Sequence, residues 1–211
     1  MTEITNIYLT RHASTDLNAQ KIMQGLIDSE LSEAGRREAA FLAADLADMN
    51  LDAIYTSDLK RAVDTAEIVA AAQKKEVPVI HDQRLREINS GEFQGRTYDD
   101  CKEMDPYSWE IAATDPLNYR PPGGELGRDI QQRMQTLLDE IVETHPGGNI
   151  LLVSHGFSIK ALTYPYVKEN YANYVKSRKP GQVYQVLANT ALLHFRHDPE
   201  EGFILVSRDA T

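Results

Sequence analysis

Short apolar runs alternate with amphipathic helical patterns along most of this chain, and this alternation constrains the fold more than any other feature. The run over residues 149–154, N-I-L-L-V-S, is almost continuously hydrophobic, which is typical of a strand buried on both faces of its sheet. Alternating strands and helices favour a mostly parallel sheet with helices on both faces. We therefore predict an α/β fold, a three-layer α/β/α sandwich with a mostly parallel central sheet. The expected strands cover residues 4–9, 53–57, 77–81 and 149–154.

Three helical patterns lie between these strands. Ser32 is the expected N-cap of a helix that reaches about residue 48, and Asp58 is the expected N-cap of the next helix. A longer helix follows from about residue 126 and ends before a Pro-Gly-Gly sequence at residues 146–148.

The alternation stops over residues 91–128, where proline and glycine are frequent. This stretch predicts an irregular, partly helical insertion over the active-site face. The C-terminal part offers three more strands, over residues 183–187, 191–195 and 203–207, and the last two are expected to pair as a hairpin. A length of 211 residues suits one domain, so we expect residues 1–211 to form a single domain that carries the insertion.

Composition narrows the partners. The net charge is −10 and no basic stripe is visible, so no nucleic-acid partner is expected. No apolar run approaches a membrane span, no signal peptide is recognised, and a single cysteine, Cys101, excludes an internal disulfide. These features predict a cytoplasmic protein without a membrane partner. A mildly basic segment over residues 168–179 leaves a homodimer open.

Charged and polar residues follow the predicted strands at their carboxyl ends. Arg11 and His12 come after the first strand, and the second strand ends at Ser57. His155 and Gly156 follow the strand over residues 149–154. Ligands of such sheets bind beyond the carboxyl ends of the strands, so we expect these residues to share one site. Arg61 and Glu87 stand in neighbouring connections and are expected to join them.

This set of residues fits the chemistry of a phosphate monoester. The forks of Arg11 and Arg61 match phosphate oxygens, and their charge disfavours a protonated His12, which keeps its lone pair for attack on phosphorus. A protonated His155 could stabilise charge on the phosphate, and Glu87 could protonate the leaving oxygen and later accept a proton from water. Thr15 and Asn18 stand where a helix should begin, and they can cap it and donate to phosphate. Ser57 is either a phosphate contact or only a helix-start residue.

Four sequence blocks in this order resemble the histidine phosphatase superfamily, in its phosphoglycerate-mutase-like branch. They are R-H-A-S-T-D-L-N, Y-T-S-D-L-K-R-A-V-D-T-A-E, L-R-E-I-N-S-G-E-F-Q-G and V-S-H-G, and P-G-G-E at residues 122–125 resembles a further block. The resemblance implies a phosphohistidine on His12, phosphate held by Arg11, Arg61 and His155, and Glu87 as proton donor. It also implies contacts from Asn18 and from the Gln24–Gly25 pair.

Two positions depart from the family pattern. The family usually has glycine where this chain has Ala13, and alanine would be strained there if its φ were positive. The family often has a basic residue where this chain has Ile22, which puts the charge or size of the substrate in doubt.

We expect a phosphomonoesterase acting on a small phosphorylated metabolite without a cofactor or a metal. Three alternatives stay open: a cofactor-dependent mutase, a phosphate-binding module without activity, and a metallohydrolase using His12 and His155. The mutases typically carry a longer insertion after the Glu87 region, whereas here about 35 residues separate Glu87 from the P-G-G-E block. This short spacing favours hydrolysis.

Overall fold

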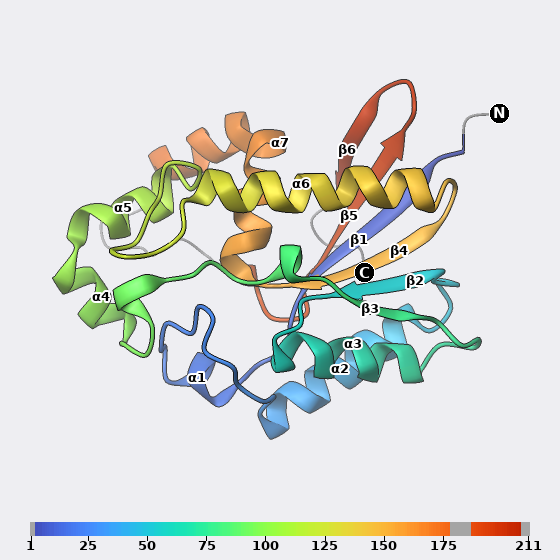
Figure 1. The fold of residues 1–211 in the computed structure, drawn as a ribbon, viewed down its shortest axis with the longest axis horizontal. Helices are drawn as coiled ribbons and strands as arrows, with labels where there is room; N and C mark the ends of the chain where they lie inside the picture. The colour runs from blue at the N-terminus through green and yellow to red at the C-terminus, as the bar shows by residue number, and fades with distance from the viewer. Residues whose placement is uncertain (1–2, 178–186, 208–211) are drawn as a thin grey trace.

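The computed structural model describes residues 3–177 and 187–207, and for residues 168–177 and 207 it describes the backbone alone (Figure 1). A central sheet of six strands runs through it. Its strand order is β3-β2-β4-β1-β5-β6. Strands β3, β2, β4 and β1 are mutually parallel, and β5 pairs with β1 in the antiparallel sense. The predicted mostly parallel sheet is therefore confirmed. The strands are β1 (Thr5–Arg11), β2 (Ala53–Thr56), β3 (Val79–His81), β4 (Asn149–Ser154), β5 (Leu192–Asp198) and β6 (Gly202–Ser207).

Helices cover both faces of this sheet. Figure 1 shows α6 and α7 on one side of it and α2 and α3 on the other. Strand β4 explains why its sequence is apolar at almost every position: Ile150 and Leu152 belong to one buried cluster, and Leu151 and Val153 to the other. The four helices are α2 (Glu33–Leu46), α3 (Lys60–Ala71), α6 (Gly127–Thr144) and α7 (Gly156–Ser177).

Helix starts follow the sequence only in part. Ser32 caps α2 as predicted, and its hydroxyl accepts from the backbone N–H of Gly35 at 3.0 Å. The predicted Asp58 cap of α3 is wrong: Asp58 Oδ1 and Oδ2 instead accept two 2.6 Å hydrogen bonds from Arg86. The carboxylate of Asp28 accepts from the backbone N–H of Lys60 at 2.8 Å in its place. A bidentate charged pair thus replaces a local cap.

The insertion is partly helical, as predicted. It holds the 3-10 turn η2 (Gly91–Phe93) and helices α4 (Tyr98–Met104) and α5 (Pro106–Thr114), which lie together at one end of the sheet (Figure 1). An isolated antiparallel bridge joins Ile22 to Thr97, so the loop after α1 (Asp16–Ala19) is tied to the insertion. The insertion is therefore attached to the segment that follows β1.

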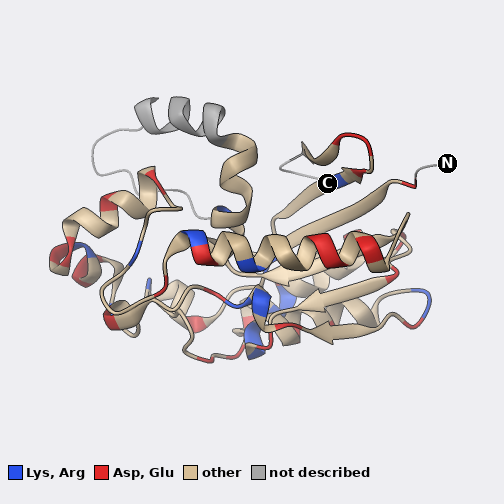
Figure 2. Cartoon of the chain, turned by 45° about the horizontal axis from the view of Figure 1, so that its top comes forward, with Lys and Arg blue, Asp and Glu red and all other residues tan. Residues whose placement is uncertain are grey.

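The C-terminal hairpin is confirmed, because β5 and β6 pair in the antiparallel sense. The predicted strand over residues 183–187 and the basic segment over residues 168–179 lie wholly or largely outside the described side chains. Helix α6 carries basic residues in its N-terminal half and acidic residues toward its C-terminal end, as the colours of Figure 2 show. None of the described helices is both long enough and apolar enough to cross a bilayer.

Candidate active site

Two histidines from neighbouring parallel strands meet at the carboxyl end of the sheet. Arg11 ends β1 and pairs in register with Ser154, the last residue of β4. The residue that follows each strand is a histidine, and the imidazole rings of His12 and His155 lie 5.1 Å apart between centroids, tilted by 55°. The predicted meeting of these two side chains is confirmed, and strand register is its cause.

His12 is held with one ring nitrogen facing the backbone and the other facing an arginine. Its Nδ1 lies 2.7 Å from the carbonyl oxygen of Ala13, so this nitrogen carries the proton. Its Nε2 accepts a 3.3 Å hydrogen bond from Nε of Arg61. The neutral ring therefore keeps its lone pair on Nε2.

Burial is the main reason why this imidazole stays uncharged. His12 is 3 % exposed, and its pKa lies well below the usual 6.5, first because of burial and then because of the charges of Arg61 and Arg11. The two arginines lower the pKa of His12, as predicted, and desolvation lowers it further and by more. A neutral imidazole is the nucleophilic form of histidine.

Arg61 is a buried cation whose fork is fixed by backbone carbonyls. Its Nη2 donates to the oxygen of Gly25 at 2.9 Å, and its Nη1 donates to the oxygen of Ile27 at 2.8 Å. Gly25 has φ +52, and a Cβ there would lie 2.4 Å from Oε1 of Gln94. Glycine at position 25 thus turns a carbonyl toward Arg61. Burial lowers the pKa of Arg61 to about 10.

Arg11 precedes His12 along the chain, and its side chain is half-buried. Its Nη1 donates to the carbonyl oxygen of Leu187 at 2.9 Å, whereas its buried Nε has no hydrogen-bond partner among the residues described. Burial lowers the pKa of Arg11, and the negative charge of Glu87 opposes that shift at both arginines. The two guanidinium groups and Glu87 therefore occupy one electrostatic neighbourhood.

His155 is fully buried, and neither of its ring nitrogens has a hydrogen-bond partner within the described part of the chain. Burial lowers its pKa well below 6.5, and the charges of Arg61 and Arg11 add to the effect. A buried polar group without a partner is costly, and such groups cluster at functional sites. Together with Nε of Arg11, these orphaned nitrogens indicate a site built for an acceptor-rich ligand.

Glu87 lies at the start of α7, which begins at Gly156. Its Oε1 accepts from the backbone N–H of Ile88 at 2.9 Å, and from the N–H and hydroxyl of Ser158 at 3.1 Å each. Among the described residues, its Oε2 accepts one such bond, from the N–H of Phe157 at 3.1 Å. The carboxylate thus caps α7, and Oε2 keeps a lone pair for a proton.

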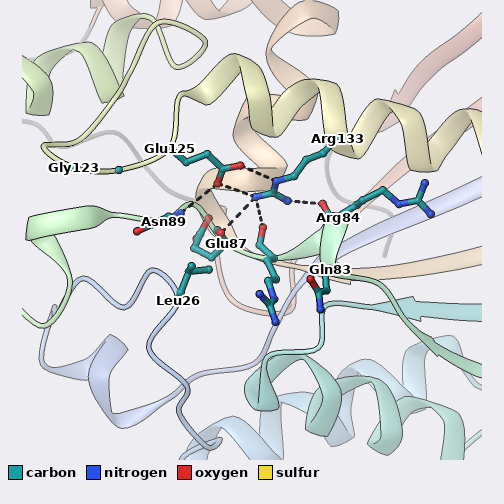
Figure 3. A pocket seen from close by; sticks show the side chains of 10 residues that line it. Leu26, Gln83, Arg84, Glu87, Asn89, Gly123, Glu125 and Arg133 are labelled. Atoms are coloured by element: carbon teal, nitrogen blue, oxygen red, sulfur yellow. Dashed lines mark hydrogen bonds and ion pairs between the residues drawn. The ribbon is translucent and has the colours of Figure 1, made fainter.

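The Glu87 segment is anchored by Arg133 of α6, which sequence reasoning missed. Figure 3 shows its guanidinium beside the carboxylate of Glu125 and reaching back to the backbone of the Glu87 segment. Nη2 donates to the carbonyl oxygen of Arg86 at 2.8 Å, and Nε pairs with Oε1 of Glu125 at 3.0 Å. The pocket in Figure 3 measures about 500 Å³. Its three arginines, at positions 84, 86 and 133, are each in an ion pair, so the pocket is not a cationic anion site.

The remaining predicted contacts lie around this centre and already have protein partners. Thr15 and Asn18 form a capping box on α1, as the sequence indicated. Oε1 of Gln24 accepts from the hydroxyl of Ser29 at 2.7 Å, and the hydroxyl of Ser57 accepts from the N–H of Leu59 at 3.2 Å. The hydrogen bond from Leu59 supports the interpretation of Ser57 as a helix-start residue. Phosphate contacts from these four side chains stay predictions.

The two departures from the family pattern cause no visible strain. Among the described residues Ala13 is absent from those with positive φ, and its methyl group is fully buried against Leu31 and Ala39. Ile22 contributes its backbone to the bridge with Thr97. The site therefore accommodates alanine after the first histidine.

Tyr98, the first residue of α4, is a neighbour of the site. Burial raises its pKa, and its charged form would interact with Arg11 and Glu87. Its ring packs against Trp109 of α5, with centroids 5.7 Å apart. The insertion thus places the hydroxyl of Tyr98 near Arg11 and Glu87. The sequence of the insertion has no regular strand or helix pattern from which this position could be predicted.

Comparisons with known proteins agree with this geometry. Residues 7–207 match the model of the histidine phosphatase superfamily (branch 1). Glucosyl-3-phosphoglycerate phosphatase of Mycolicibacterium vanbaalenii is 36 % identical over 76 % of this chain and 73 % of its own. Phosphoglycerate mutase-like protein 4 of Arabidopsis thaliana is 32 % identical over 92 % and 80 %. The solved structure of YhfR from Bacillus stearothermophilus superposes with a TM-score of 0.83 at 36 % identity, covering 98 % of both chains.

Proposed function

The chain belongs to the histidine phosphatase superfamily (branch 1), and we propose that it hydrolyses the phosphate monoester of a small metabolite through a phosphohistidine on His12. The observation that carries this proposal is the neutral, buried imidazole of His12, whose Nε2 faces the guanidinium of Arg61 at 3.3 Å. A phosphate placed there would meet a nucleophile and a cation at once.

In the first step Nε2 of His12 attacks phosphorus. The N–P bond forms while the bond from phosphorus to the ester oxygen breaks, and the leaving oxygen takes the proton from Oε2 of Glu87. Arg11, Arg61 and a His155 protonated in the presence of the phosphate dianion hold the equatorial oxygens. The products of this step are phosphohistidine, ionised Glu87 and a free alcohol.

In the second step water replaces the alcohol. Glu87 accepts a proton from water as its oxygen attacks phosphorus, the N–P bond breaks, and His12 regains its lone pair. Inorganic phosphate then leaves, and Glu87 is again protonated for the next turnover. The guanidinium groups supply the positive charge throughout both steps.

The remaining residues of the site act on the edge of the phosphate. The oxygen of Asn18 is used in the capping box, so its amide N–H groups are left for a ligand. Thr15 sets that box, and Gln24 and Ser57 shape the loops around the phosphate. The backbone of Gly156 opens α7, whose N-terminus favours an anion.

The test is phosphate release from p-nitrophenyl phosphate and from a panel of phosphorylated metabolites. His12→Ala should abolish turnover and the trapping of phosphorylated enzyme, whereas the exposed His81→Ala should leave both unchanged. Binding of phosphate by the wild type without turnover on any ester would overturn the proposal in favour of a non-catalytic phosphate-binding module.

Two other reactions are separated by further assays. The resemblance to a mutase-like relative favours a second candidate, phosphoryl transfer between positions of a phosphoglycerate, and rapid interconversion of 3- and 2-phosphoglycerate would establish it. A metallohydrolase would lose its activity in excess chelator. In the described residues no group of three or more His, Cys, Asp or Glu side chains is arranged to hold a metal ion.

The proposal includes a reducing compartment such as the cytoplasm, because the cysteine at position 101 is buried and free. A homodimer is compatible with a site built from one chain, and sedimentation would measure its presence.

A further inference from the structure

The two peptide groups that flank His12 are each held at both ends. In the group before it, the oxygen of Arg11 accepts from the N–H of Thr190 at 3.0 Å, and the N–H of His12 donates to the oxygen of Ser154 at 2.9 Å. In the group after it, the oxygen of His12 accepts a 2.7 Å hydrogen bond from Nδ2 of Asn189. The N–H of Ala13 in that same group donates to Oγ1 of Thr65 at 3.0 Å.

Within the described part of the chain, both partners of the second peptide group are side chains. Thr65 lies on α3, and its hydroxyl donates a 2.7 Å hydrogen bond to the backbone carbonyl oxygen of Arg61. Thr65 therefore links this peptide group to the backbone of the arginine. Asn189 approaches from the opposite side, 177 positions further along the chain. Because a peptide group is planar, fixing its oxygen and its N–H fixes its rotation.

The rotation of this peptide group affects the His12 ring, because the ring contacts the carbonyl oxygen of Ala13, the residue that follows. The oxygen of Ala13 lies 2.7 Å from Nδ1 of His12 and sets which ring nitrogen is protonated. A change at the peptide group between His12 and Ala13 would therefore move both the Cα of His12 and the acceptor that orients its ring.

The turn that carries Asn189 is strained. Thr190, which follows it, has φ +59, a conformation that β-branched residues rarely adopt. Such strain persists only where the surroundings over-determine it, and it gathers at functional sites. The strained residue also delivers its N–H to the oxygen of Arg11, so the turn serves both residues of the Arg11–His12 pair.

We propose that Asn189 is a positioning residue, which aims the Nε2 of His12 by holding the peptide group between His12 and Ala13. The inference rests on the catalytic role proposed for His12. A purely architectural role would be met by the Thr190 bond, which already fixes this turn to the end of β1. The Asn189 side chain adds a bond to the oxygen of the peptide group after His12, whose N–H is already held by the side chain of Thr65.

The test compares Asn189→Ala and Asn189→Asp with the wild type. Both variants remove the N–H donor, and a nucleophile displaced by a fraction of an ångström to 1 Å loses up to about 10²-fold in rate. We expect kcat to fall by about 10- to 100-fold on p-nitrophenyl phosphate, while the inhibition constant of inorganic phosphate changes less than about threefold. In Asn189→Asp the ratio of its kcat to that of the wild type should rise as the pH falls, because a protonated carboxyl group can donate again.

Asn6→Ala is the matched control, because Asn6 lies at the other end of β1 and its Nδ2 also donates to a neighbour, Oδ1 of Asn149, at 3.1 Å. It should keep wild-type kcat. The proposal is overturned if Asn189→Ala keeps more than half of the wild-type kcat, if Asn6→Ala loses as much, or if the Asp variant shows a flat ratio across pH.

A failure of the proposed function can be recognised separately. If the wild type itself neither turns over nor becomes phosphorylated, the ¹⁵N shifts of the His12 ring report on its positioning directly. A changed population of the Nδ1–H tautomer in Asn189→Ala would then support the contact as a positioning device, and identical shifts in the two proteins would overturn it.

Discussion

Nδ1 of His12 lies 2.7 Å from the carbonyl oxygen of Ala13, the next residue along the chain. This contact assigns the ring proton to Nδ1 and leaves Nε2 as the nucleophile that faces Arg61. The tautomer is thus set by the backbone of the same turn that carries the histidine, whereas in many sites a carboxylate sets it.

The first prediction concerns which nitrogen is phosphorylated. We expect the trapped phosphoenzyme to carry its phosphoryl group on Nε2 of His12, because Nδ1 is occupied by the Ala13 oxygen. The two phosphohistidine isomers are distinguished by ³¹P NMR after a rapid alkaline quench. A phosphoryl group found on Nδ1 would contradict the assignment.

The second prediction concerns stability against pH. His12 and His155 are both buried with pKa values held well below 6.5, first by burial and then by neighbouring charge. Below about pH 6.5 the two histidines therefore bind protons in the unfolded chain but stay neutral in the folded protein. The contribution of the two histidines to the unfolding free energy is fully present above about pH 6.5. It falls as the pH drops below that value toward the folded pKa, by up to about 1.4 kcal/mol per pH unit for each histidine.

Denaturant unfolding at pH 7, 6 and 5 measures this slope. His155→Asn should show a shallower loss of unfolding free energy over that range, because one of the two histidines that bind a proton only in the unfolded chain is gone. The comparison uses slopes, so a uniform loss of stability in the variant does not affect it. Equal slopes in the variant and the wild type would refute the assignment of the effect to His155.

The third prediction concerns Ala13, which stands where the family usually has glycine. Its φ is not positive, and its methyl group is buried against Leu31 and Ala39. Ala13→Gly should therefore lower the unfolding free energy by about 1 kcal/mol, because it removes a buried methyl group and adds backbone freedom. A gain in both stability and activity would show that the methyl group is an intrusion after all.

The strand ends could be predicted from sequence because a parallel sheet brings its carboxyl ends to one edge. That rule placed Arg11, His12 and His155 together, and the register of β1 and β4 confirms it. Residues that act by long-range hydrogen bonds to backbone, such as Asn189, left no local pattern to read.

Two further cases show where local reasoning fails. The cap of α3 was misplaced because an ion pair with Arg86 competes for the carboxylate of Asp58, and such competition is invisible in a local pattern. The anchoring of the Glu87 segment by Arg133 was missed because its acceptors are backbone carbonyls, which every residue has.

The fourth prediction concerns the proton that Glu87 gives to the leaving group. Among the described residues, Oε1 accepts from the backbone N–H groups of Ile88 and Ser158, whereas Oε2 accepts from the N–H of Phe157 alone, so Oε2 is the oxygen placed to carry a proton. Glu87→Gln keeps the shape of the side chain but cannot transfer that proton. An alkyl phosphate needs the proton because its alkoxide is a poor leaving group, whereas p-nitrophenolate leaves unaided.

We therefore expect Glu87→Gln to lower kcat/KM by about 10²- to 10⁴-fold for an alkyl phosphate and far less for p-nitrophenyl phosphate. Ser158→Ala is the matched control, since it removes a hydroxyl that lies 3.1 Å from Oε1 and 2.7 Å from the carbonyl oxygen of Arg86, and it leaves the carboxyl group intact. It should lower kcat/KM for both esters by the same small factor, because it loosens Glu87 without removing its proton. An equal loss on both esters in Glu87→Gln would mean that Glu87 serves only as the cap of α7, and the proton donor would then have to be sought elsewhere in the site.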